Sequence, residues 1–159
     1  MKAFAKTFIF AVLSVLLIAG TSAGTRADDA ANIKSVQAAY DAFGKGDVPA
    51  ILAGLSDDVA WETIGPASAC ACFGPRKGKA AVGEFFKVVG ETWDFTEFKP
   101  KEFNASGDKV FVLGHYAMKV KKTGKSVASD WVHVFTLKDG KVVAFKEFMD
   151  SAALAEGTK

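Results

Sequence analysis

The segment between positions 127 and 137, VASDWVHVFTL, has a strand pattern with two largely apolar sides. One set of alternate positions places a histidine among bulky apolar residues: Val127, Trp131, His133, Phe135 and Leu137. The other set is also largely apolar: Ala128, Asp130, Val132, Val134 and Thr136. Because successive side chains of a strand point to opposite faces, the pattern predicts a strand well inside a sheet. A titratable ring among aromatic side chains also makes His133 the first residue to consider for chemistry.

Further strands are predicted where alternation or aromatic residues recur along the chain. These segments are 59–64, 92–104, 110–120 and 142–149. The Asp139-Gly140 dipeptide is a strong hairpin signal between the last two strands. Residues 56–58 are predicted to form a turn and residues 65–78 a loop, since both are rich in small or polar residues. The tail from Ala152 is expected to be loose.

Apolar residues at helical spacing predict three helices. They cover residues 30–43, 47–55 and 79–89. Asp47 has the position of an N-cap residue, with Pro49 in the first turn of the second helix. The order of elements predicts one α+β domain over residues 28–159: a curved antiparallel sheet with about three helices packed on its concave side, which makes a cone with a pocket inside.

The first 27 residues are predicted to be a cleavable signal peptide. Lys2 and Lys6 precede an apolar run from 8 to 20, and small residues follow with cleavage sites after Ala23 or Ala27. An uncleaved anchor is the alternative, although the run is short for a membrane span. We therefore expect a periplasmic or secreted protein, free of the membrane after cleavage.

The charge of the mature chain argues against one class of partner. Cleavage after Ala27 removes three basic residues, which leaves 17 basic against 18 acidic residues and a net charge of −1. No basic stripe interleaved with aromatic residues remains, so nucleic-acid binding is not expected. Nothing in the sequence calls for a cofactor.

Two cysteines lie one residue apart, at Cys70 and Cys72. In an exported protein such a pair indicates a disulfide, although the ring that it closes is small. Free thiols, a bridge to a second chain and a metal site are the alternatives, in that order. A structural zinc site needs about four ligands, and only these two are close in sequence.

Four segments in order resemble the SnoaL-like branch of the NTF2-like superfamily, which includes the ketosteroid isomerases. They are AAYDAFGKGDVPAILAGLSDDVAWE, FGPRKGKAAVGEFF, KEFNASGDKVFVLGHYAMKVKKTGK and WVHVFTLKDGKVVAFKEFMDSAAL. The resemblance implies the same cone-shaped fold, and a homodimer through the outer sheet face, where Phe111, Leu113, Val132 and Val134 are apolar. The superfamily hosts many activities on one fold, so the likeness does not specify a reaction.

Ketosteroid isomerases use an aspartate base, and their oxyanion hole combines a tyrosine with a protonated aspartate. By position the base falls on Thr63, which cannot act as one. The oxyanion aspartate falls on His133 and the tyrosine falls near Tyr40. The resemblance thus implies the fold and an inward-facing His133, but not the isomerase mechanism.

His133 and Glu147 are the candidate catalytic residues. His133 is predicted to act as a general base or to donate a hydrogen bond to a ligand oxygen; a core histidine bonded to a neighbour is the alternative. Glu147 is predicted to hold the histidine tautomer or to act as an acid, or else to form a salt bridge at the sheet edge. Asp130 and His115 are expected on the opposite face, with a bulge that brings Asp130 round as the alternative. Asp150 is expected to be structural.

Seven further residues are expected to line the pocket and bind a ligand: Tyr40, Trp61, Thr63, Tyr116, Met118, Trp131 and Phe135. Packed core is the alternative for each aromatic residue. The leading functional hypothesis is binding of a small hydrophobic molecule. One alternative is an acid–base enzyme of the isomerase, cyclase or hydrolase type that uses His133 and Glu147. A second is an interaction module whose pocket is filled by its own side chains.

Overall fold

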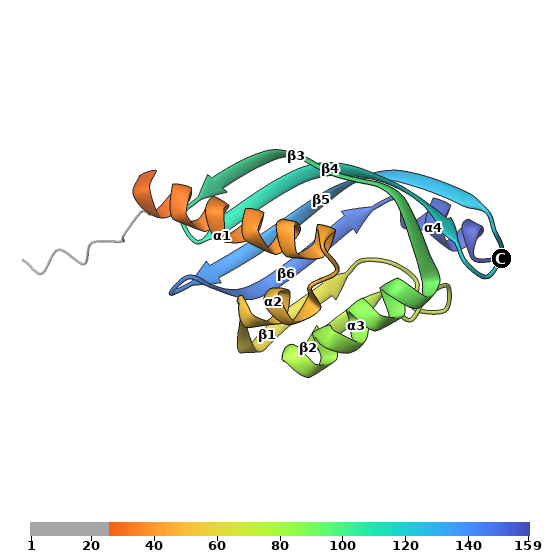
Figure 1. Ribbon diagram of the computed structural model, residues 1–159, viewed down its shortest axis with the longest axis horizontal. Helices are drawn as coiled ribbons and strands as arrows, with labels where there is room; N and C mark the ends of the chain where they lie inside the picture. Colours follow the sequence, from red (N-terminus) through yellow and green to blue (C-terminus); the bar gives the residue numbers. More distant parts are fainter. Residues whose placement is uncertain (1–25) are drawn as a thin grey trace, which may run out of the picture.

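The computed structural model describes residues 26–159, which form one curved sheet with helices on one face (Figure 1). The strands are β1 (Leu55–Thr63), β2 (Gly74–Lys77), β3 (Trp93–Ser106), β4 (Lys109–Val120), β5 (Ser126–Lys138) and β6 (Lys141–Met149). The helices are α1 (Arg26–Gly44), α2 (Val48–Ala53), α3 (Lys79–Thr92) and α4 (Ser151–Gly157). The predicted α+β class is confirmed, and the sheet curves without closing into a barrel.

The six strands follow the order β2-β1-β6-β5-β4-β3. Strands β3 to β6 are joined by short turns and therefore pair antiparallel, as predicted. The expectation of a wholly antiparallel sheet was wrong, because β1 pairs parallel with β6. These two strands are far apart in sequence, so no hairpin constrains their relative direction.

The predicted helices are confirmed, with small differences at their ends. The side chain of Asp47 accepts a hydrogen bond of 3.0 Å from the Ala50 N–H, which is the N-cap interaction expected for α2. Helix α1 begins before the predicted residue 30, and α3 continues to Thr92 instead of 89. Together α1, α2 and α3 cover the inner face of the sheet (Figure 1).

Three local predictions were wrong. Residues 56–58 belong to β1 instead of a turn, and the loop over 65–78 contains the short strand β2. The tail is not loose, because Asp150 caps α4 by accepting from the Ala153 N–H, and Leu154 is buried. Both missed elements are too short to show periodicity, and each is stabilised by contacts with distant segments. The structural role expected for Asp150 is confirmed.

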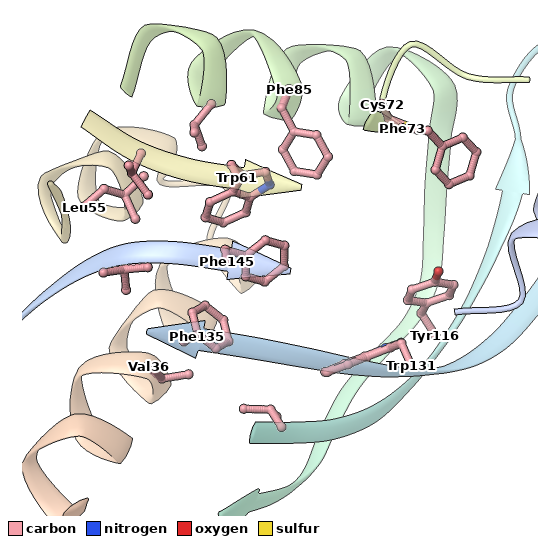
Figure 2. Packing of buried hydrophobic residues seen from close by; sticks show 14 of the residues in the cluster. Val36, Leu55, Trp61, Cys72, Phe73, Phe85, Tyr116, Trp131, Phe135 and Phe145 are labelled. Atoms are coloured by element: carbon pink, nitrogen blue, oxygen red, sulfur yellow. The ribbon is translucent and has the colours of Figure 1, made fainter. Parts of the chain in front are cut away.

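The core lies between the inner face of the sheet and the helices. Figure 2 shows Trp61, Phe145 and Phe135 on neighbouring strands, with Phe85 of α3 over them. The Trp131 ring is accommodated by Gly114, its partner on β4, because a Cβ there would lie 2.0 Å from the indole Cζ2 atom. Gly114 is therefore required by a close approach within the sheet.

The predicted signal peptide lies outside the described residues, except for Arg26 and Ala27 at the start of α1. Among the helices of residues 26–159, none is both long and apolar enough to cross a membrane.

Candidate functional site

Three neighbouring strands bring the candidate polar residues together. His133 of β5 pairs with Glu147 of β6, and Glu147 in turn pairs with Thr63 of β1. Side chains at paired positions lie side by side on the same face of a sheet. All three are buried, with residue exposures of 6%, 9% and 3% for His133, Glu147 and Thr63. The alternation along β5 and β6 therefore places both predicted catalytic residues on the inner face.

Hydrogen bonds and a charge contact connect these residues to α1. The Tyr40 hydroxyl lies 2.9 Å from Nδ1 of His133. On the other edge of the imidazole, Nε2 is 3.3 Å from Oε1 of Glu147. The Thr63 hydroxyl donates to the second carboxylate oxygen, Oε2, at 3.2 Å. The result is a continuous row from the helix across three strands: Tyr40, His133, Glu147 and Thr63.

The row defines which imidazole nitrogen carries a proton. Burial, reinforced by the charge of Glu147, raises the pKa of Tyr40, so its phenol stays neutral and can donate to Nδ1. A hydrogen on Nε2 then faces the carboxylate, whereas the opposite tautomer would set two lone pairs against each other. We assign the Nε2–H form on this electrostatic ground.

Three buried N–H donors in and beside the site lack hydrogen-bond partners, those of His133, Trp61 and Trp131. Although Nε2 of His133 is close to Glu147, the contact does not have hydrogen-bond geometry, and the nitrogen is left without a partner within the protein. The indole Nε1 of Trp61 is likewise buried and unpartnered. An unsatisfied buried donor costs about 1–3 kcal/mol. Oxygen atoms of a ligand would remove that penalty.

A cavity of about 100 Å³ lies against the row. Eight of the nine predicted site residues line it: Tyr40, Trp61, Thr63, Tyr116, Met118, His133, Phe135 and Glu147. Trp131 does not line it. Its ring instead stacks against the His133 imidazole, with centroids 3.9 Å apart, and supports that ring from the side. The rest of the lining is almost entirely apolar and aromatic.

The sequence did not single out several residues that also line the cavity. They include Phe43 of α1, Phe85 and Phe86 of α3, Phe95 and Phe98 of β3, and Phe145 of β6. Their apolar spacing was visible as helix and strand periodicity. That signal does not distinguish a cavity wall from packed core, because both are apolar.

Asp130 and His115 lie on the outer face, as predicted. Their side chains are 2.8 Å apart at Oδ1 and Nδ1, and the Asp130 side chain is 83% exposed. Strands β4 and β5 pair without a register shift, so no bulge turns Asp130 inward. Neither residue belongs to the cavity.

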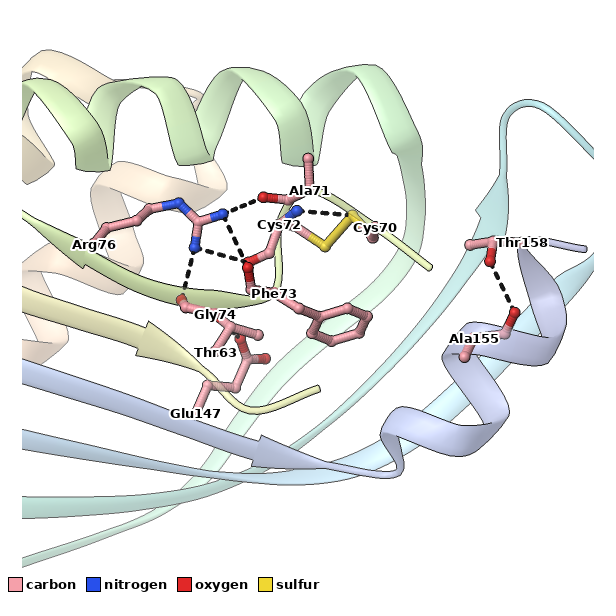
Figure 3. Close-up of a disulfide and its surroundings, with 10 residues drawn as sticks. All are labelled: Thr63, Cys70, Ala71, Cys72, Phe73, Gly74, Arg76, Glu147, Ala155 and Thr158. Carbon is pink, nitrogen blue, oxygen red and sulfur yellow. Dashed lines mark hydrogen bonds between the residues drawn. A yellow bond between two sulfur atoms is a disulfide. The ribbon is translucent and has the colours of Figure 1, made fainter. Parts of the chain in front are cut away.

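Cys70 and Cys72 form a disulfide in the loop that follows β1 (Figure 3). Both are buried, and Cys72 and Phe73 line the cavity. The Arg76 guanidinium donates to four carbonyl oxygens of this loop, those of residues 71–74. It also lies 5.2 Å above the Phe85 ring. Within residues 26–159 no group of three or more His, Cys, Asp or Glu side chains could hold a metal ion.

The family model described as "SnoaL-like domain" matches residues 36–145. The match covers more than half of the chain and ends within β6, so it does not include Glu147. The chain therefore belongs to the SnoaL-like domain family, as the sequence resemblance implied. Comparison with curated proteins gave no significant match.

Solved structures agree with this assignment. An NTF2-like protein from Burkholderia xenovorans LB400 is similar at 30% identity, with a TM-score of 0.75 over 82% of this chain and 97% of that one. TerC, co-crystallised with polyporic acid, is similar at 29% identity, with a TM-score of 0.73 over 80% and 98%. An LEH-like epoxide hydrolase from M. tuberculosis, at 21% identity and TM-score 0.64 over 81% and 90%, shares the fold. The fold and the family support a small-molecule-binding domain.

Proposed function

We propose that this domain binds a small hydrophobic molecule bearing at least one oxygen acceptor, with the oxygen placed against His133. The observation that carries the proposal is the unpartnered Nε2–H of a buried histidine on the wall of an apolar cavity. The Trp61 indole N–H adds a second donor. Apolar walls with a few placed polar groups are typical of small-molecule sites. TerC, whose structure includes polyporic acid, is consistent with a ligand of this class.

Phenol is a suitable probe, because it combines one aromatic ring with one oxygen. We expect it to bind the wild type and to quench tryptophan fluorescence, since Trp61 lines the cavity. His133→Ala should weaken binding about tenfold or more, the loss of one buried hydrogen bond. His115→Ala is the matched control and should bind as the wild type does. Equal affinities for all three proteins would remove His133 from the site.

An acid–base enzyme is the second candidate, and one observation favours it. The carboxylate of Glu147 lies beside Thr63, at the position where the resemblance to ketosteroid isomerases placed a catalytic base. Glu147 and His133 together form a buried acid–base pair next to the cavity. Exchange of the α-protons of a cyclic ketone in D₂O, followed by NMR, tests this candidate. Glu147→Gln should abolish any exchange above the background rate.

The proposal also includes export and a homodimer. Leu113 and Phe148 are exposed on the outer face, at 40% and 45%, and Val132 lies between them in register. This apolar row supports a subunit interface. Native mass spectrometry of protein from its own compartment would give the mass of the processed chain, any bound ligand and the subunit number. An unprocessed monomer without bound mass, together with no phenol binding, would favour the filled-core interaction module.

A further inference from the structure

The cavity beside His133 is small for a ligand site. At about 100 Å³ it has room for a single ring, whereas pockets for larger organic ligands usually measure about 300–1,000 Å³. A second hollow of about 700 Å³ lies between α1 and β3, on the solvent side of the same aromatic residues. Any ligand larger than one ring needs this additional space.

The cavity and the groove share part of their walls. Tyr40, Phe43, Phe95 and Phe98 line both. Within this set the Phe43 and Phe98 rings lie closest together, with centroids 4.7 Å apart, and both side chains are only half-buried. One layer of aromatic side chains therefore separates the two hollows. Rotation of such rings about their side-chain torsions needs no change in the backbone.

The shape of β3 opens the groove. β3 is the edge strand of the sheet, and its pairing with β4 shifts register between Phe95 and Glu97 and again between Pro100 and Glu102. Bulges of this kind bend a strand and increase its twist. Figure 1 shows β3 turning sharply between its contact with α3 and its contact with α1. The groove lies along this bent strand.

The outer part of the groove has a different polarity from the cavity. Its polar lining residues are Gln37, Asp41, Thr96 and Glu97, and no lysine or arginine lines it. Glu97 is paired with Lys99 at 3.1 Å, but Asp41 forms no ion pair among the described residues. The groove therefore favours a hydroxyl or amino group that donates hydrogen bonds, whereas the inner cavity favours an oxygen that accepts them.

We propose that the groove is the outer half of one elongated ligand site, and that Phe43 and Phe98 form the gate between its halves. The ligand class is a linked two-ring compound: an inner ring whose oxygen meets His133, and an outer ring that carries a donor group near Asp41. The inference rests on the proposed function, because the inner half is the cavity described above. Phe43 and Phe98 are thus specificity-determining residues that select ligands by length.

The test compares phenol with 4-phenylphenol in a titration of tryptophan fluorescence. Gly44 lines the groove, and a Cβ added there meets no atom within 4 Å. Gly44→Phe should therefore fill the groove without disturbing the fold. We expect it to weaken 4-phenylphenol binding about tenfold and to change phenol binding by less than about twofold. Gly90→Phe on α3 is the matched control, since Gly90 is equally open and lies outside the groove.

Two further variants test the gate and the outer donor. Phe98→Ala removes one of the two gate rings and should speed association of 4-phenylphenol about tenfold. A 4-amino group on the outer ring should tighten binding, and Asp41→Asn should remove that gain.

The outcomes separate the two proposals. If phenol binding depends on His133 but neither Gly44→Phe nor Phe98→Ala changes 4-phenylphenol binding, the elongated site is wrong and the proposed function stands. If neither probe binds the wild type, both proposals are wrong.

Discussion

The sheet carries two histidine–carboxylate pairs, one on each face, and they differ in almost every physical respect. On the outer face His115 and Asp130 are 2.8 Å apart with hydrogen-bond geometry, and their side chains are 30% and 83% exposed. On the inner face His133 and Glu147 are 3.3 Å apart without that geometry, and their side chains are 8% and 12% exposed. The hydrogen bond with the better geometry therefore belongs to His115 and Asp130, which lie away from the cavity.

Burial and an unfilled hydrogen bond, and not a short distance, are therefore what make the inner pair the candidate for function. Water competes for the outer pair, so its contribution to stability is small. The inner pair lies in a medium that strengthens charge interactions and penalises unpaired polar groups. A protein that keeps such a pair next to a cavity gives up stability there, which is characteristic of binding and catalytic sites.

The substitution with the largest expected effect disrupts the support of the inner His133–Glu147 pair and leaves the outer His115–Asp130 pair in place. Gly114→Ala adds a Cβ that would lie 2.0 Å from the Trp131 ring, which supports His133. We expect the free energy of unfolding to fall by about 3 kcal/mol, the upper range for overpacking, and phenol binding to be lost. Urea denaturation measures the change. Gly90→Ala, where the added Cβ has open space, is the control, and equal stability of the two variants would contradict the close approach.

The next prediction compares the coupling energies of the two pairs, which double-mutant cycles measure directly. Alanine substitutions of His133 and Glu147, singly and together, should give a coupling energy of about 2 kcal/mol. The same cycle for His115 and Asp130 should give less than about 0.5 kcal/mol. Urea denaturation of each variant supplies the free energies. A larger coupling for the outer pair would overturn the comparison.

The sequence alone predicted most of the fold, because long segments show clear periodicity. The resemblance implied an inward-facing His133, whereas alternation left the side of Glu147 open, because Lys146 and Glu147 are adjacent charges. The sequence could not show that Thr63 lies beside Glu147, since that contact depends on the parallel register of two strands far apart in the chain. The cavity volume could not be predicted from the sequence either, because it depends on how individual aromatic rings pack.

Removal of the disulfide, which lies on the inner side of the sheet, should have a smaller effect on stability. The double variant Cys70→Ser, Cys72→Ser opens a ring of very few residues, so the loss of unfolding free energy should be about 1–2 kcal/mol. Arg76 donates to the same loop and holds it independently of the sulfur atoms. Phenol affinity should therefore change by less than about threefold. Loss of binding in this variant would show that the loop depends on the disulfide.

The smallest effect concerns the two tyrosines, Tyr40 and Tyr116, which both belong to the inner side. Burial is the main cause that raises the pKa of each phenol, and the charge of Glu147 adds to it. The unfolded chain ionises its tyrosines near pH 10, whereas the folded protein keeps them neutral. Stability is thus unaffected by these groups below about pH 10 and falls above it, as the unfolded state loses protons first.

A spectrophotometric titration of phenolate absorbance measures this directly, because the chain has no other tyrosine. We expect no phenolate in the folded protein near pH 10, followed by the appearance of both phenolates together as the protein unfolds at higher pH. In denaturant both should titrate at about pH 10. One phenolate that appears near pH 10 in the folded protein would mean that water reaches the inner face and would contradict this prediction.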